Sequence, residues 1–165
     1  MNATQETPVI PSALEADGAL AGSHSVFVRQ GQRFGLPVEF VREVIHGRSL
    51  TRIPRRVDSV AGVLNLRGDM LPVVLVDQWL ELPFQPYDPA RPIVVLRQGE
   101  LLVGIQVDAV QRVASIPRAE VSPSPSAGRS AHLRSIWNVA GQPLVTLIDA
   151  KPLLAAIREH VGQDH

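Results

Sequence analysis

The sequence lacks cysteine altogether, and aromatic residues make up only 4% of its 165 positions. Without cysteine, the chain can form no disulfide bond, no cysteine-ligated zinc site and no cysteine nucleophile. Hydrophobic residues nevertheless amount to 45%, so aliphatic side chains must build the core. A chain of this length suits one domain or two very small ones, and it can bury a core without disulfides.

Charge and long apolar runs are also scarce. Sixteen basic and sixteen acidic residues cancel, and charged residues make up 19% of the chain. A net charge of zero argues against a bulk nucleic-acid binder, whose affinity comes from neutralising phosphates. The apolar stretches 71–76 and 93–96 are too short to span a bilayer, and the first 22 residues lack the basic region of a signal peptide. We therefore expect a cytoplasmic protein.

Motifs for catalysis are missing as well. The five histidines stand at positions 24, 46, 132, 160 and 165, and none lies in an H-x-H or H-E-x-x-H arrangement. The sequence contains no G-x-S-x-G elbow, no P-loop and no G-x-G-x-x-G segment. We therefore predict no catalytic residue, no metal and no cofactor; a hydrolase would need a site that the sequence does not show.

What the sequence does contain is a series of β-hairpin patterns. Paired apolar runs around short turns predict hairpins over 26–38, 60–76, 93–107 and 133–148. Residues 1–23 are typical of a disordered tail, and the Pro/Ser/Gly-rich segment Ser122 to Ser130 of a mobile loop. Helical spacing near the end predicts a helix over about 149–160, with Asp149 as a possible N-cap.

The pattern starts over in the second half of the chain. The ten residues from Gly35 to Val44 match those from Gly104 to Val113, and 65–68 match 138–141. The period of roughly 70 residues indicates two similar small β units, each marginal alone, that share an apolar seam. Gly68 and Gly141 are the structural turn residues of the two copies. Arg67 has Ala140 as its counterpart, so turn geometry does not require it, and we predict a partner or interdomain role for Arg67.

The zero net charge hides a basic block followed by an acidic one. The block from Arg42 to Arg67 holds six arginines, at positions 42, 48, 52, 55, 56 and 67, against Glu43 and Asp58. A solvated or partner-facing rim is the favoured interpretation. The alternative is a small β-barrel module that binds nucleic acid through this block, although it lacks interleaved aromatic residues.

One segment resembles a known family. Residues 60–74, Val-Ala-Gly-Val-Leu-Asn-Leu-Arg-Gly-Asp-Met-Leu-Pro-Val-Val, are similar to the G-V-[IL]-N-L-R-G signature of CheW-like domains, the coupling (adaptor) proteins of bacterial chemotaxis. Supporting likeness upstream and downstream extends the resemblance over roughly 24–158. One departure stands next to the signature: where the family usually continues with Asp-Leu-Arg, this chain has Leu75-Val76-Asp77.

The resemblance implies a fold and a division of the chain. The fold is all-β: two five-stranded SH3-like β-barrels packed side by side, with short helical turns and a C-terminal helix. The CheW-like domain would cover 24–158, with a first barrel over about 24–84, a second over about 91–148 and the helix over about 149–160.

The resemblance also implies a function without catalysis. The chain would couple the cytoplasmic tips of chemoreceptors to the regulatory domain of a CheA-type histidine kinase, and it would meet the membrane only through receptor arrays. Four residues correspond to the family's receptor-binding groove: Val41, Glu43, Arg67 and Val110. Whether the output is flagellar, pilus-based or a second messenger stays open, as do the cognate receptor and the oligomeric state.

Overall fold

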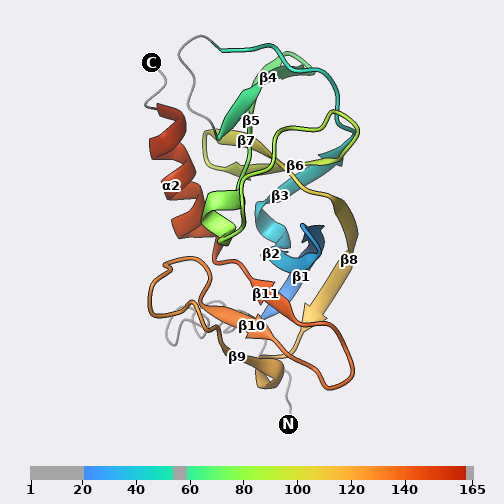
Figure 1. The fold of residues 1–165 in the computed structure, drawn as a ribbon, viewed down its shortest axis with the longest axis vertical. Helices are drawn as coiled ribbons and strands as arrows, with labels where there is room; N and C mark the ends of the chain where they lie inside the picture. Colours follow the sequence, from blue (N-terminus) through green and yellow to red (C-terminus); the bar gives the residue numbers. More distant parts are fainter. Residues whose placement is uncertain (1–20, 54–58, 163–165) are drawn as a thin grey trace.

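The computed structural model describes residues 21–53 and 59–162. Within these ranges the chain is mostly β, with two sheets and a single α-helix (Figure 1). The predicted tail over 1–23 lies outside the described residues except for its last three positions. The elements in chain order are β1 (Gly22–Arg29), β2 (Gln32–Pro37), η2 (Val38–Phe40), β3 (Val41–Ile45), β4 (Val60–Leu66), β5 (Asp69–Val74), η3 (Asp77–Leu80), β6 (Ile93–Gln98), β7 (Leu101–Gln106), β8 (Ala109–Ile116), η4 (Arg118–Glu120), β9 (Val121–Pro123), β10 (Ser135–Trp137), β11 (Val145–Leu147) and α2 (Ala150–Gly162).

The strands form one sheet of six, in the order β8-β1-β2-β11-β10-β9, and one of five, in the order β3-β6-β7-β5-β4. Figure 1 shows the six-stranded sheet in the lower half and the five-stranded sheet in the upper half, with α2 along one side. The short turn η4 joins the two edge strands of the larger sheet, and a bridge between Thr51 and Val63 brings the chain after β3 onto β4. Both sheets therefore curl toward closure, and the predicted all-β class with two SH3-like units and a C-terminal helix is confirmed. The larger sheet has six strands where five were expected.

The strand pairing corrects the expected division into a first barrel over 24–84 and a second over 91–148. The first hairpin, β1-β2, pairs with β8 and β11 from the second half of the chain. The hairpin β6-β7 pairs with β3 and β5 from the first half. The two copies of the repeat thus exchange their first hairpins. A division of the chain in sequence order assumes that strands pair with their neighbours in the same copy, so it cannot predict this exchange.

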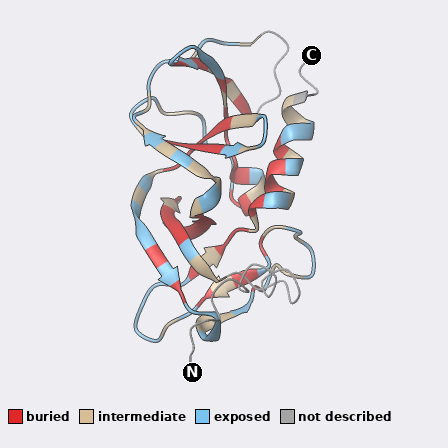
Figure 2. Cartoon of the chain, turned by 180° about the vertical axis from the view of Figure 1, so that it is seen from behind, coloured by how far each residue is buried: buried red, intermediate tan, exposed pale blue. Residues whose placement is uncertain are grey.

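The predicted apolar seam between the units is confirmed. Each sheet has its own small cluster of buried residues, and a third, larger one lies between the sheets and under α2. Figure 2 shows the buried residues on the inner faces of the strands and along one side of the helix. This central cluster includes Phe27, Phe34 and Leu36 from the first copy and Leu96, Val103 and Ile105 from the second. Since both copies supply it, neither sheet can bury its apolar surface without the other.

Close packing explains the glycine that the two copies share. A Cβ atom on Gly104 would lie 2.7 Å from Ile93 Cγ2, and one on Gly35 would lie 3.1 Å from Leu147 Cδ2. Each glycine pairs with a strand of the other copy, Gly104 with Val73 in β5 and Gly35 with Leu147 in β11. The shared glycine is therefore a packing requirement in both copies.

Two sequence expectations need revision. Strands β3 and β8 have no alternating apolar pattern, because each is an edge strand with exposed polar residues, and the sequence did not predict them. The predicted mobile loop Ser122 to Ser130 begins inside β9 and is tied to η3. Glu81 accepts hydrogen bonds from Ser126 Oγ at 2.7 Å and from Arg129 Nη2 at 3.0 Å.

The C-terminal helix begins where the sequence predicts. The Asp149 carboxylate accepts a hydrogen bond from the backbone N–H of Lys151, which caps the first turn. Burial raises the pKa of Asp149, and this hydrogen bond offsets the shift only in part. Leu153, Leu154 and Ile157 then lie fully buried in the central cluster, so α2 covers the seam.

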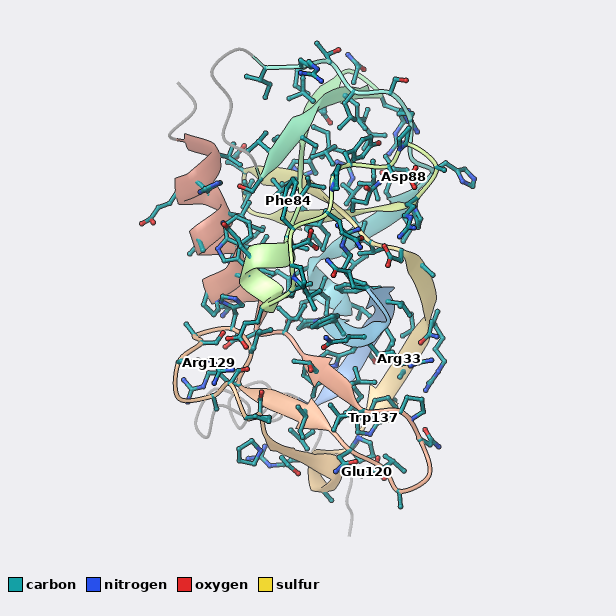
Figure 3. All side chains as sticks on the ribbon, viewed as in Figure 1. Arg33, Phe84, Asp88, Glu120, Arg129 and Trp137 are labelled. Atoms are coloured by element: carbon teal, nitrogen blue, oxygen red, sulfur yellow. The ribbon has the colours of Figure 1, made fainter. Side chains whose placement is uncertain are left out.

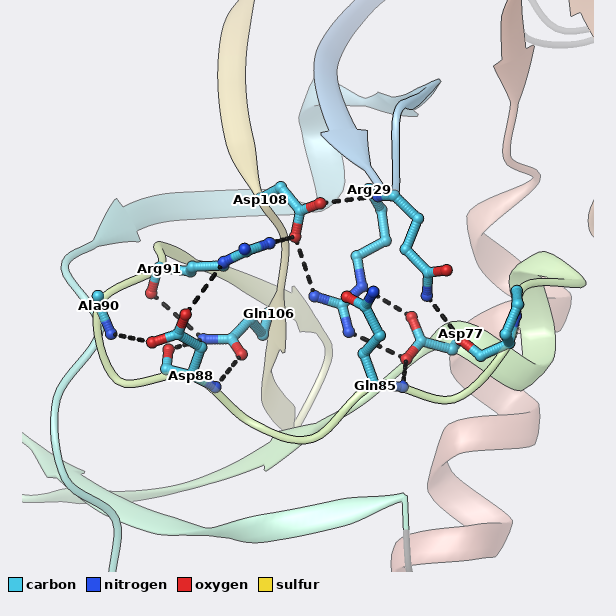
Figure 4. A network of polar contacts seen from close by, with 10 residues as sticks. Arg29, Asp77, Gln85, Asp88, Ala90, Arg91, Gln106 and Asp108 are labelled. Carbon is cyan, nitrogen blue, oxygen red and sulfur yellow. Dashed lines mark hydrogen bonds and ion pairs between the residues drawn. The ribbon is translucent and has the colours of Figure 1, made fainter.

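A buried ion pair also crosses this seam (Figure 4). Arg29, at the end of β1, donates to both carboxylate oxygens of Asp77, with distances of 2.7 Å from Nε and 2.9 Å from Nη2. Both side chains are only 1% exposed. Arg29 Nη1 also donates to Asp108 at 3.1 Å, and Arg91 lies 2.5 Å from the same oxygen. Arg29 thus neutralises the buried carboxylate of Asp77.

We expect Arg29→Met to lower the free energy of unfolding by about 3–5 kcal/mol, because it leaves the Asp77 charge buried without its partner. Arg129→Met is the matched control: its pair with Glu81 is exposed, so its loss should cost at most about 1 kcal/mol. Urea unfolding of both variants measures the difference. The double variant Arg29→Leu with Asp77→Leu should recover much of the loss; equal costs for the two single variants would contradict a role for burial.

His24 is a buried titratable side chain inside the six-stranded sheet. Its Nδ1 lies 3.2 Å from the Gly22 carbonyl oxygen, to which it donates, and its Nε2 has no hydrogen-bond partner among the described residues. Burial lowers the pKa of His24, while the Gly22 carbonyl and the charge of Glu39 partly oppose this. The folded protein therefore holds His24 neutral at a pH where the unfolded chain takes up a proton.

We predict that the free energy of unfolding falls as the pH drops below the ordinary histidine pKa of about 6.5, by at most about 1.4 kcal/mol per pH unit from His24. Above that pH both states hold a neutral ring, and His24 makes no contribution. Urea unfolding at pH 7.5 and 5.5 measures the loss. His24→Leu should show a smaller loss over the same interval; an identical loss would assign it to other groups.

Candidate functional site

Strands β3 and β8 hold equivalent places in the two sheets. Each follows the second strand of its copy, lies at a sheet edge, and pairs with the first strand of the other copy's hairpin. Each also carries a register shift at the same repeat position, between Val41 and Glu43 on β3 and opposite Val26 and Phe27 on β8. A bulge inserts one residue and so changes the face on which later side chains lie.

This bulge divides each strand between two clusters. Val41 pairs with Leu96 and Val110 pairs with Phe27, and both valines pack, partly buried, against the central cluster. Beyond the bulge, Glu43 pairs with Val95, which belongs to the five-stranded sheet's own cluster. Val41 and Val110 therefore border the seam from its two sides, whereas Glu43 lies toward the end of the five-stranded sheet.

Glu43 and Arg67 are brought together by the fold. Arg67 Nη2 donates to Glu43 Oε2, joining the β4-β5 turn to the opposite edge strand β3. The side chain of Arg67 is 61% exposed and that of Glu43 27%. An ion pair this exposed adds at most about 1 kcal/mol to stability, so both charges stay available to a partner at little cost to the fold.

The backbone at Arg67 has a left-handed conformation that does not favour arginine. Arg67 has φ of 49° and Gly68 of 94°, both in the left-handed region, and Gly141 in the other copy has 80°. Asn65 Oδ1 accepts a hydrogen bond from Gly68 N at 2.9 Å and holds the turn. Glycine, asparagine or aspartate adopt this conformation more readily than arginine. The turn therefore tolerates Arg67 rather than requiring it.

The equivalent end of the six-stranded sheet differs in chemistry. Arg112 takes the repeat position of Glu43 and lies 5.6 Å from the centre of the Trp137 ring. Trp137 Nε1 donates to Glu120 Oε1 at 2.9 Å, and Figure 3 shows both residues in that half of the molecule. The end of the five-stranded sheet carries the Arg67–Glu43 ion pair, whereas the equivalent end of the six-stranded sheet carries the Arg112–Trp137 contact. The two ends therefore differ as binding surfaces, although the two copies of the repeat are similar.

The structure adds residues that the sequence did not single out as site candidates. Arg42 Nη1 lies 4.0 Å from the Asp69 carboxylate. Together with the Arg67–Glu43 pair, this places two carboxylates beside the two arginines at this end of the five-stranded sheet. Val44 is 44% exposed and its repeat equivalent Val113 64%. The alignment of the two copies pairs these valines, but their exposure depends on the bulge, which leaves no sequence signal.

Neither a cluster of metal-ligating side chains nor a helix suited to crossing a membrane occurs among the described residues. Within 21–53 and 59–162, no group of three or more histidine, aspartate or glutamate residues could hold a metal ion. No helix in these ranges is long and apolar enough to cross a membrane.

Comparison with known proteins identifies relatives across most of the chain. The CheW-like domain family model matches residues 24–158. Chemotaxis protein CheW of Klebsiella aerogenes is 26% identical over 146 residues, which are 85% of this chain and 88% of that protein. Protein FrzA of Myxococcus xanthus is 31% identical over 130 residues, 77% of this chain and 81% of FrzA. Protein PilI of Pseudomonas aeruginosa is 29% identical over 109 residues, 66% of this chain and 60% of PilI.

A solved structure has the same fold. The scaffolding protein TtCheW from Thermoanaerobacter tengcongensis superimposes with a TM-score of 0.67 at 23% identity, covering 79% of this chain and 90% of TtCheW. That likeness supports the arrangement of the two sheets, and the family match extends over the site strands β3 and β8 and the turn at Arg67. The chain therefore belongs to the CheW-like family of chemotaxis proteins.

Proposed function

We propose that this chain is a noncatalytic adaptor that couples chemoreceptors to a CheA-type histidine kinase in a bacterial chemosensory array. Family membership supports the adaptor role. The observation that carries the receptor contact is the exposed Glu43–Arg67 pair, whose Glu43 lies on β3, the same edge strand that begins at the seam with Val41. The chain would work in the cytoplasm, associated with membrane-bound receptors.

The receptor contact combines an apolar groove with a charged edge. Val41 and Val110 take apolar side chains of the receptor's helical tip, because each is partly buried and rests on a rigid cluster. Glu43 and Arg67 fix the register of the helix through their opposite charges. The kinase regulatory domain, which has the same fold in this family, meets the chain in a pseudo-symmetric contact between barrels.

The nucleic-acid alternative has less support. Of the six arginines in the block from Arg42 to Arg67, Arg42 and Arg67 already lie beside Glu43 and Asp69. Arg55 and Arg56 lie outside the described residues. A backbone-binding surface needs a stripe of uncompensated cations, and this end of the sheet alternates its charges.

Arg67→Ala should weaken binding to a receptor signalling fragment roughly tenfold or more while moving the melting temperature by no more than about 4 °C. The reason is that the pair is exposed and the turn is held by Asn65. Calorimetry with the fragment and a thermal melt measure the two quantities. A large loss of stability with binding intact would assign Arg67 a purely structural role.

A charge exchange separates partner recognition from the internal pair. The double variant Glu43→Arg with Arg67→Glu keeps an ion pair, so its stability should match that of the wild type. It reverses the polarity presented to the receptor, so receptor binding should stay at least about tenfold weaker. Kinase binding serves as the control and should not change. Recovery of receptor binding in the double variant would show that only the internal pair matters.

A further inference from the structure

The middle of the basic block borders a groove, lined by both apolar and polar residues, that the adaptor role leaves unused. Leu50 and Arg52 form one wall, Phe84 and Tyr87 the other, and Ala61 and Leu75 line it between them; the cavity measures about 400 Å³. We call it the 50/84 groove. Its volume lies at the lower end of the range for ligand sites, about 300–1,000 Å³, which suits one or two side chains rather than a folded element.

The first wall is fixed on the sheet. Thr51, between Leu50 and Arg52, makes two backbone hydrogen bonds with Val63 of β4, at 2.8 and 2.9 Å. Neighbours of a residue in extended backbone lie on its opposite side, so Leu50 and Arg52 extend together on one side. Leu50 packs against the five-stranded sheet's own cluster, which leaves the Arg52 side chain exposed beside it.

The second wall is held at both ends. Tyr87 Oη donates to the Arg48 carbonyl oxygen at 2.5 Å and accepts from Arg48 N at 3.2 Å, which ties this wall to the first. Gln85 N donates to Asp77 Oδ2 at 2.9 Å, and Asp88 N donates to Gln106 Oε1 at 2.8 Å. Figure 4 shows these anchors. A groove with fixed walls binds with a small ordering cost.

Apolar surface and charge in the groove point to one kind of occupant. Phe84 is 58% exposed on the connection between η3 and β6, where Figure 3 shows it. Arg52 lines the groove and Arg48 adjoins it, and neither has an ion pair with any residue that the structure describes. The nearby carboxylate of Asp88 is engaged by Arg91 at 3.2 Å and by Ala90 N at 2.9 Å.

We propose that the 50/84 groove binds an extended acidic peptide segment of a partner protein, with one aromatic or aliphatic side chain between Phe84 and Leu50 and flanking carboxylates on Arg48 and Arg52. A peptide fits better than a nucleic acid because the floor is aliphatic and two cations are too few for backbone binding. This role is separate from the receptor contact at Arg67. It gives Arg48 and Arg52, which have no ion pair with a residue in 21–53 or 59–162, a partner of opposite charge.

The test uses the full chain labelled with ¹⁵N and the synthetic peptide Glu-Glu-Phe-Glu-Glu, acetylated and amidated. We expect saturable shifts at residues 49–52 and 84–89, with a dissociation constant on the order of 0.1–1 mM. Replacing the central phenylalanine by alanine should weaken binding at least about fivefold, because one buried aromatic side chain carries the anchor. The peptide Lys-Lys-Phe-Lys-Lys should not bind.

Protein variants assign the contact to this groove. Phe84→Ser, and the double variant Arg48→Glu with Arg52→Glu, should each weaken peptide binding roughly tenfold. Arg97→Glu is the matched control, an exposed arginine on β6 outside the groove, and should change binding less than twofold. A thermal melt confirms that each variant is folded.

Four results would overturn the proposal. The alanine peptide could bind as tightly as the phenylalanine peptide, or Arg97→Glu could lose as much affinity as the groove variants, either of which would reduce the effect to general charge. Tighter binding of a ten-residue oligothymidylate would identify a nucleic-acid surface. Shifts at 49–52 and 84–89 that depend on protein concentration without peptide would identify a second copy of this chain as the occupant.

Discussion

The exchange of hairpins between the two copies of the repeat is the constraint on which the structure depends. Strands β1 and β2 complete a sheet begun by the second copy, and β6 and β7 complete one begun by the first. The central cluster then draws residues from both copies and from α2. Neither sheet can form from one copy of the repeat alone: the five-stranded sheet takes its strands from 41–106, across both copies, and the six-stranded sheet takes its strands from the chain on either side of that stretch.

The same exchange places the functional residues. Because β3 and β8 are the strands that accept the exchanged hairpins, each borders the seam at its start and its own sheet's cluster at its end. The bulges change the face on which the side chains of each strand lie, so one strand can contact both clusters. They set Val41 and Val110 beside the seam. The buried Arg29–Asp77 pair crosses the seam nearby, and its link to Asp108 lies two residues before Val110. A buried polar contact thus crosses the seam close to Val110.

The sequence predicts local structure well here and long-range pairing poorly. Four hairpins, the capping Asp149 and the shared seam follow from apolar periodicity, turn residues and the repeat, which are local or internal signals. The partners of each hairpin do not follow, since Gly35 and Gly104 show that packing is close but not which strand packs there. The Arg29–Asp77 pair spans 48 residues, and no spacing rule connects two such positions. Glu43 and Arg67 come from the family resemblance as site positions, whereas their ion pair and the exposure of Val44 and Val113 need the folded chain.

Kinase coupling is the central claim, and one reconstitution tests it most directly. Membranes that carry the cognate receptor are mixed with the CheA-type kinase, with and without this chain, and the rate of kinase autophosphorylation is measured. We predict that the rate responds to the receptor's ligand only when the chain is present, and that Arg67→Ala abolishes most of this response. A kinase that responds equally without the chain, or that ignores receptor ligand in its presence, would contradict the account.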